Sequence, residues 1–81
     1  MTVYDAREHE FVDEVLDMMP VVEDVAALVK DYFPRLSMKK CERQAEWYVA
    51  RVMRIYDYTR EEHIFEQEYK CAKALYRALC R

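Results

Sequence analysis

The sequence of 81 residues contains no glycine, and this absence excludes several kinds of functional site. Phosphate-binding loops and dinucleotide-binding turns require several glycines, because the backbone there approaches the phosphate closely or adopts a positive φ. Two-residue β-hairpin turns also favour glycine, so a fold rich in hairpins is not expected. The missing glycines therefore argue against nucleotide-binding loops and against a β-rich structure.

Cysteines and long apolar runs are also scarce. The three cysteines, Cys41, Cys71 and Cys80, are odd in number and form no C-x-x-C pair, so we expect neither a disulfide framework nor a structural zinc site. No apolar run approaches the roughly 20 residues that span a membrane. The first residues lack a basic segment followed by an apolar run, so we expect no signal peptide and a cytoplasmic protein with free thiols.

The composition and charge are those of a small globular domain. Hydrophobic residues make up 53% of the chain and charged residues 36%, and the length predicts one domain over residues 1–81. The net charge of −3 is unevenly divided: residues 1–34 hold nine acids and two bases, whereas residues 35–81 hold seven acids and eleven bases. The acidic half is expected to form a solvated face, or alternatively to imitate a phosphate backbone. The basic half either packs on it or faces a partner.

Two short helices are expected in the first half of the chain. The first runs from about Asp5 to Met18, with Asp5 as its N-cap and Thr2 as an alternative start. The second places Pro20 in its first turn, where the missing N–H of proline costs nothing, and it ends before Pro34.

Two longer helices are expected in the second half. Ser37 caps the third helix, and Thr59 with Glu62 fits a capping box that favours a break before the fourth, although a continuous helix is also possible. Apolar residues at helical spacing predict the buried faces: Met38, Cys41, Ala45, Tyr48, Val52 and Ile55 on the third helix, and Phe65, Tyr69, Ala72, Tyr76 and Leu79 on the fourth. The pattern predicts an all-α fold, a small compact bundle of about four helices in which the two shorter ones pack on a longer C-terminal hairpin.

No catalytic or metal-binding constellation is expected. A di-iron bundle needs glutamate three residues before each liganding histidine, and neither His9 nor His63 has one there. Cys41 and Cys71 lie on apolar helical faces, where cysteine behaves as a small hydrophobe. We therefore expect a protein that is not an enzyme, with no catalytic residue, no metal ligand and no cofactor.

One face of the third helix carries the candidate binding residues. Cations and large aromatic side chains, including the only tryptophan, recur there at spacings of three and four residues. This basic aromatic stripe consists of Lys40, Arg43, Trp47, Arg51, Arg54 and Tyr58. Arginine, tryptophan and tyrosine are the residue types enriched in the energetic centres of protein interfaces.

Three interpretations of the stripe compete. In the first, the stripe packs against the acidic face of the first helix, where Glu10, Asp13 and Asp17 align. In the second, it binds an acidic surface of another protein. In the third, it binds nucleic acid, for which cations and stacking rings are suitable, although the net negative charge and the lack of a known motif disfavour this interpretation.

The sequence predicts a protein whose function is to bind another protein or protein complex. Eleven aromatic residues exceed what so small a core buries, so several are expected at the surface or in an interface. In its size, its aromatic content and the opposite charges of its halves, the chain resembles small virus-encoded inhibitors of host machinery, anti-CRISPR proteins among them. That resemblance implies an inhibitor or modulator. The alternatives are a homo-oligomeric structural or adaptor protein, a homodimer included, and a nucleic-acid-binding helical protein; no membrane partner is expected.

Overall fold

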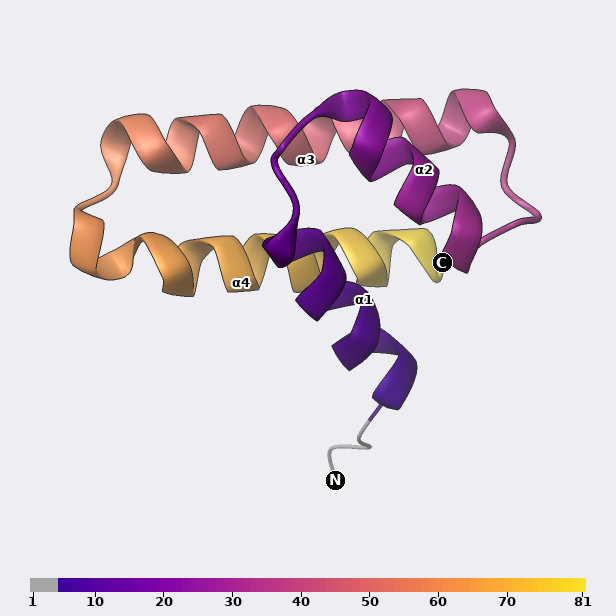
Figure 1. Ribbon diagram of the computed structural model, residues 1–81, viewed down its shortest axis with the longest axis horizontal. Helices are drawn as coiled ribbons and strands as arrows, with labels where there is room; N and C mark the ends of the chain where they lie inside the picture. Colours follow the sequence, from indigo (N-terminus) through magenta and orange to yellow (C-terminus); the bar gives the residue numbers. More distant parts are fainter. Residues whose placement is uncertain (1–4) are drawn as a thin grey trace.

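The computed structural model describes residues 5–81, and all regular structure in this range is helical. The four helices are α1 (Ala6–Asp17), α2 (Val22–Tyr32), α3 (Met38–Tyr58) and α4 (Glu61–Leu79) (Figure 1). Two helices of 11 or 12 residues thus precede two of 19 or more. This arrangement confirms the predicted all-α bundle.

Side-chain caps fix the starts of α1 and α3 where the sequence predicts them. The Asp5 carboxylate accepts hydrogen bonds from the backbone N–H groups of Arg7 and Glu8, at 3.0 and 3.1 Å. The Ser37 hydroxyl accepts one from the N–H of Lys40 at 3.2 Å. Each bond satisfies a donor that the first helical turn leaves without an intrahelical partner. Thr2, the alternative cap of α1, lies outside the described residues.

The start of α2 differs from the prediction. Pro20 was expected in its first turn, but the helix begins at Val22 with Val21 as an extended N-cap residue. The Val21 N–H donates to the Met19 carbonyl at 2.7 Å, a tight local turn. A proline disfavours helical geometry in the residue before it, and here the residue after it, Val21, is also outside the helix and extended.

The third and fourth helices are separate. Thr59 is the extended residue that ends α3, and its N–H donates to the Ile55 carbonyl at 2.9 Å. The next residue, Arg60, is also extended and precedes α4 without a side-chain cap bond. The predicted break is therefore present, but Thr59 closes α3 and does not cap α4.

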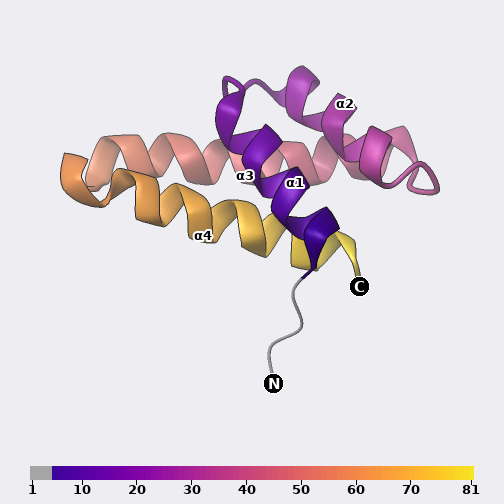
Figure 2. The same cartoon turned by 60° about the horizontal axis from the view of Figure 1, so that its bottom comes forward.

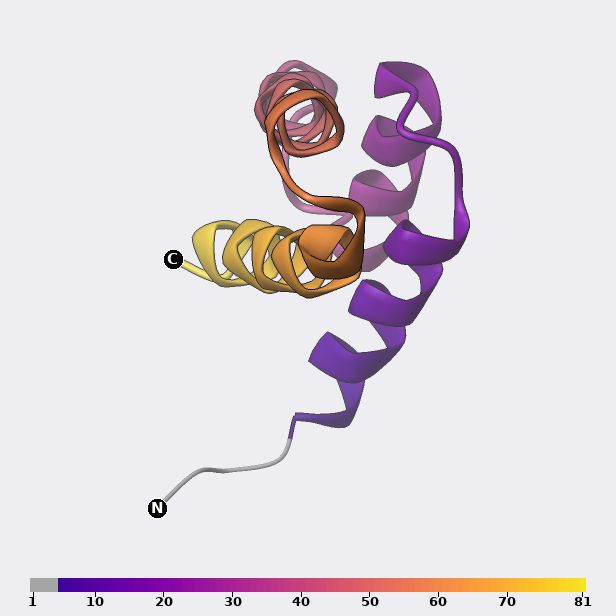
Figure 3. The ribbon, with the colours of Figure 1, turned by 90° about the vertical axis from the view of Figure 1, so that its left-hand side faces the viewer.

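The molecule has two layers. Figure 3 shows α1 and α2 stacked in one layer and the α3–α4 hairpin in the other. Figure 2 shows α1 crossing the hairpin obliquely in front of α4. Contacts follow the same division, because α1 packs on α4 and α2 packs on α3. One face of the hairpin is therefore covered by the N-terminal helices, and the other face is covered by no described element.

Phe11 joins the two layers at the centre of the core. Its ring is fully buried and lies 5.3 Å from the Tyr32 ring of α2 and 5.4 Å from the Tyr76 ring of α4, between ring centroids. Burial of a phenylalanine side chain contributes about 1.5–3 kcal/mol of transfer free energy, and aromatic pairs add to it. This cluster fixes how the N-terminal layer sits on the hairpin.

The closed end of the hairpin projects beyond the N-terminal layer (Figure 1). Phe65, which the apolar spacing places on the buried face of α4, is 70% exposed and borders a hollow beside the last turns of α1. The spacing identifies the correct face of the helix. The face is not buried at Phe65 because α1 and α2 are too short to cover the whole hairpin.

Candidate functional site

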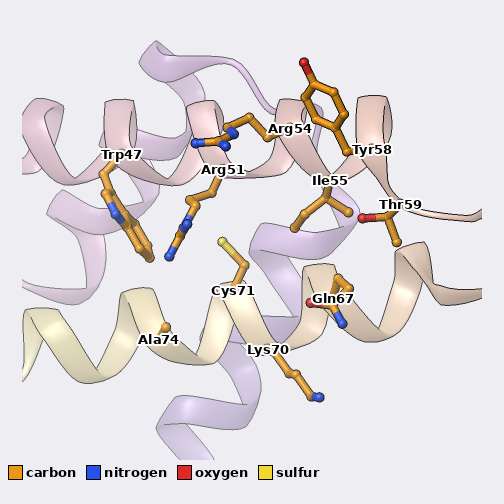
Figure 4. Close-up of a pocket in the computed structure, with 10 residues that line it drawn as sticks. All are labelled: Trp47, Arg51, Arg54, Ile55, Tyr58, Thr59, Gln67, Lys70, Cys71 and Ala74. Atoms are coloured by element: carbon orange, nitrogen blue, oxygen red, sulfur yellow. The ribbon is translucent and has the colours of Figure 1, made fainter.

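Two adjoining hollows lie along the uncovered face of the hairpin, between α3 and α4. Their volumes are about 450 and 680 Å³, and they share Trp47, Lys70 and Ala74 (Figure 4). We call them together the interhelical groove. Its lining residues are Gln44, Trp47, Arg51, Arg54, Ile55, Tyr58 and Thr59 from α3 and its C-cap, and Gln67, Lys70, Cys71, Lys73, Ala74, Arg77, Ala78 and Arg81 from α4 and the chain end.

Trp47 and Arg51 project from α3 toward α4 (Figure 4). The Arg51 guanidinium carbon lies 5.6 Å from the centroid of the Trp47 ring, within the range of a cation–π contact. Trp47 is 39% exposed, so part of the ring remains free for a ligand. The pair presents an aromatic surface and a positive charge side by side in the middle of the groove.

Cys71 forms part of the groove floor opposite Arg51. Its sulfur points toward α3 in Figure 4, and the side chain is buried. Burial raises the pKa of this thiol to about 11, although the positive charge of Arg51 acts in the opposite direction. The buried thiol therefore keeps its proton at neutral pH, and in this form cysteine packs as a small apolar group.

The groove is lined by cations and by no carboxylate among the described residues. Arg51 and Arg54 come from α3, while the α4 side supplies Lys70, Lys73, Arg77 and Arg81. Two of these cations form ion pairs: the Lys70 ammonium lies 3.3 Å from Glu66, and Arg77 lies 3.8 Å from Glu8, whose side chain is only 19% exposed. The Lys70–Glu66 pair is exposed and contributes little energy, so a ligand carboxylate competes with it readily.

The groove contains four of the six residues of the basic aromatic stripe. Trp47, Arg51, Arg54 and Tyr58 line it, and Trp47 and Arg51 point into it. Tyr58 is 83% exposed and points away from α4, at the rim. Lys40 and Arg43 are exposed on α3 but line neither hollow.

One interpretation of the stripe is wrong. It was weighed as a brace against the acidic face of the first helix, but α1 packs on α4 and α2 and makes no helix contact with α3. The acidic residues Glu10, Asp13 and Asp17 are exposed on α1, in the layer on the other side of the hairpin (Figure 3). Within residues 5–81, the stripe and the acidic face therefore lie on opposite sides of the molecule.

Sequence reasoning missed the half of the groove that α4 supplies. Lys70, Lys73, Arg77 and Arg81 lie near the C-terminal end of α4, where cations favour the negative end of the helix dipole, and the sequence by itself suggests only this structural reason for them. Their spacings of three, four and four residues place them on one helical face, which is the signal that was available. The cationic face of α4 lies beside the stripe on α3 because of the rotation of α4 about its own axis. The packing of α1 on α4 determines this rotation.

Metal-binding clusters and membrane-spanning helices are absent from the described part of the chain. No group of three or more histidine, cysteine or acidic side chains is placed to hold a metal ion within residues 5–81. No described helix is both long and apolar enough to cross a membrane. The interhelical groove is thus the feature with the clearest chemical character.

Comparison with protein-family models, with curated proteins and with solved structures finds no match to this chain. The function is therefore argued from the groove itself.

Proposed function

We propose that the protein is a small non-enzymatic binding protein that inhibits or modulates a larger protein or complex, and that the interhelical groove is its binding face. The observation that carries the proposal is that cations from α3 and α4 line the same hollows as Trp47, on a face that no described element covers. A virus-encoded inhibitor such as an anti-CRISPR protein is one form of this proposal, based on the resemblance in size and character.

The residue types in the groove support protein binding. Arginine and tryptophan are the anchors most often found at the centres of protein interfaces, and the Arg51–Trp47 pair occupies the centre here. The exposed methyl groups of Ala74 and Ala78 add apolar surface between the charged side chains. A partner surface that combines carboxylates with apolar groups matches this composition.

The proposal is tested by photo-cross-linking at two matched alanines. A benzophenone amino acid replaces Ala74 in the groove or Ala27 on the exposed side of α2, which lies in the other layer. The Ala74 position is expected to give protein cross-links that survive nuclease treatment and disappear when Arg51→Glu and Arg54→Glu are added. Cross-links at Ala27 alone, or groove cross-links that nuclease removes, would contradict the proposal.

A further inference from the structure

We infer that the groove receives an acidic α-helix of the partner protein, lying along α3 and α4 as a third helix; this inference rests on the function proposed above. The groove runs from Gln44 to Tyr58 on α3. At 1.5 Å per residue, this is about 21 Å, or about four helical turns. A helix of ordinary length fits that span.

The cations of α4 recur with the period that an acidic helix presents. Lys70, Lys73 and Arg77 follow one another at three or four residues along α4, and Arg81 follows just beyond the end of the helix. A second helix lying beside α4 has the same pitch, so carboxylates spaced by three and four residues meet one cation in each turn. An extended acidic peptide has a repeat of about 3.3 Å per residue and does not keep this correspondence.

Small side chains in the groove allow a helix to approach closely. Ala74 and Ala78 lie between the charged residues and are exposed. Helices pack at 8–10 Å between axes when the side chains at the contact are small or interdigitate. Trp47 then covers the apolar side of the incoming helix, and Arg51 next to it reaches a carboxylate.

The protein's own carboxylates pair with only part of the groove. Glu8 pairs with Arg77 and Glu66 with Lys70, whereas the acidic residues that align on one face of α1 lie in the opposite layer of the molecule. Arg51 and Arg54 form no ion pair within residues 5–81, so their charge is available to a partner.

A single-stranded nucleic acid matches the groove less well. Such ligands are held by aromatic rings on which successive bases stack. The two rings that line the groove, Trp47 and Tyr58, are separated by about 16 Å along α3. Tyr58 also points away from α4 (Figure 4). One ring inside the groove supports a single anchor and not a row of stacked bases.

The test uses Trp47 as the reporter, because it is the only tryptophan and lies in the groove. A labelled peptide of about 18 residues carries glutamates on one helical face and alanine and leucine on the other. A control peptide of the same composition has its glutamates scattered around the helix. Binding is followed by tryptophan emission and by the anisotropy of the peptide label, and an oligo-thymidine strand is tested as a competing ligand. We expect the ordered peptide to bind at least about tenfold more tightly than the control peptide and than the oligo-thymidine strand.

Two charge-reversed variants locate the binding. Arg51→Glu with Arg54→Glu lies in the groove, whereas Lys40→Glu with Arg43→Glu changes the same charge on the same helix outside it. Circular dichroism checks that both fold. The first pair is expected to weaken peptide binding at least about tenfold more than the second.

Three results would overturn the inference: equal binding of the scattered peptide, tighter binding of oligo-thymidine, or equal loss in the two variants. If the ordered peptide does not bind but Ala74 still gives nuclease-resistant cross-links, the helical ligand is rejected and a protein partner is retained. If the peptide does not bind and Ala74 gives no such cross-links, the proposed function is rejected as well.

Discussion

The Arg51 guanidinium lies over the Trp47 ring, with 5.6 Å between the guanidinium carbon and the ring centroid. The two residues are one helical turn apart on α3, so the sequence alone places them on one face. The structure adds that this face is open and that cations of α4 lie across from it. The pair therefore belongs to a groove between two helices and not to a stripe on one.

Reversal of the groove charges is expected to leave folding almost unchanged. Arg51 and Arg54 are exposed and form no ion pair within residues 5–81, so the double change to glutamate removes only a weak cation–π contact. We expect the free energy of unfolding, measured in urea, to change by less than about 1 kcal/mol. A loss of several kcal/mol would mean that the two arginines brace the fold.

Truncation of Phe11 is expected to be severely destabilising. The ring is fully buried among Tyr32, Phe33 and Tyr76, and it joins the two layers. Phe11→Ala should lower the free energy of unfolding by about 3–5 kcal/mol in urea titration. Phe65→Ala is the matched control, because that ring is 70% exposed and its removal should cost less than about 1 kcal/mol. Similar losses for both would contradict the described core.

The helices were predictable from the sequence because their signals are local. Ser37 and Asp5 cap the helices that they were expected to cap. The apolar spacing of α3 correctly identifies Cys41, Ala45 and Tyr48 as buried, whereas Met38, in the first turn of the same pattern, is 48% exposed. These features depend on residues within a few turns of one another. The exposure of Phe65 was not predictable in this way, because it depends on how far α1 and α2 extend over the hairpin.

The α3 side of the groove was predictable from local spacing, but its position opposite α4 was not. Trp47, Arg51 and Arg54 share a face of one helix, and their spacing shows it. Their position opposite Lys70 and Lys73 depends on how α4 is rotated and packed. That rotation is set by contacts between residues far apart in the sequence, such as those of Phe11 with Tyr76.

Lys30 is expected to hold the connection between α2 and α3. Its ammonium donates hydrogen bonds to the backbone carbonyls of Pro34 and Leu36. Lys30→Met removes both bonds while keeping the length of the side chain, and we expect a loss of about 1–3 kcal/mol in the free energy of unfolding. Lys39→Met, an exposed lysine on α3, should change it by less than about 0.5 kcal/mol. Equal effects would show that the loop does not depend on these bonds.

Stability is expected to fall at alkaline pH through Cys71. Burial raises the pKa of its thiol from an ordinary value of about 9 to about 11. Below pH 9 the thiol is protonated in both the folded and the unfolded chain; between pH 9 and 11 only the unfolded chain loses the proton, which favours unfolding. Urea titrations across this range should show a declining free energy of unfolding. The decline should be shallower in Cys71→Ala, and an identical slope would contradict the assignment.

The molar mass in solution tests most directly whether the groove is open to a foreign partner. Light scattering on a size-exclusion column, at several concentrations, should give a mass near 9.9 kDa throughout. A stable mass near twice that value, returning to the single-chain value in the variant with Arg51→Glu and Arg54→Glu, would show that a second copy occupies the groove. That result would contradict the proposed binding of a different protein and would favour a homodimeric adaptor.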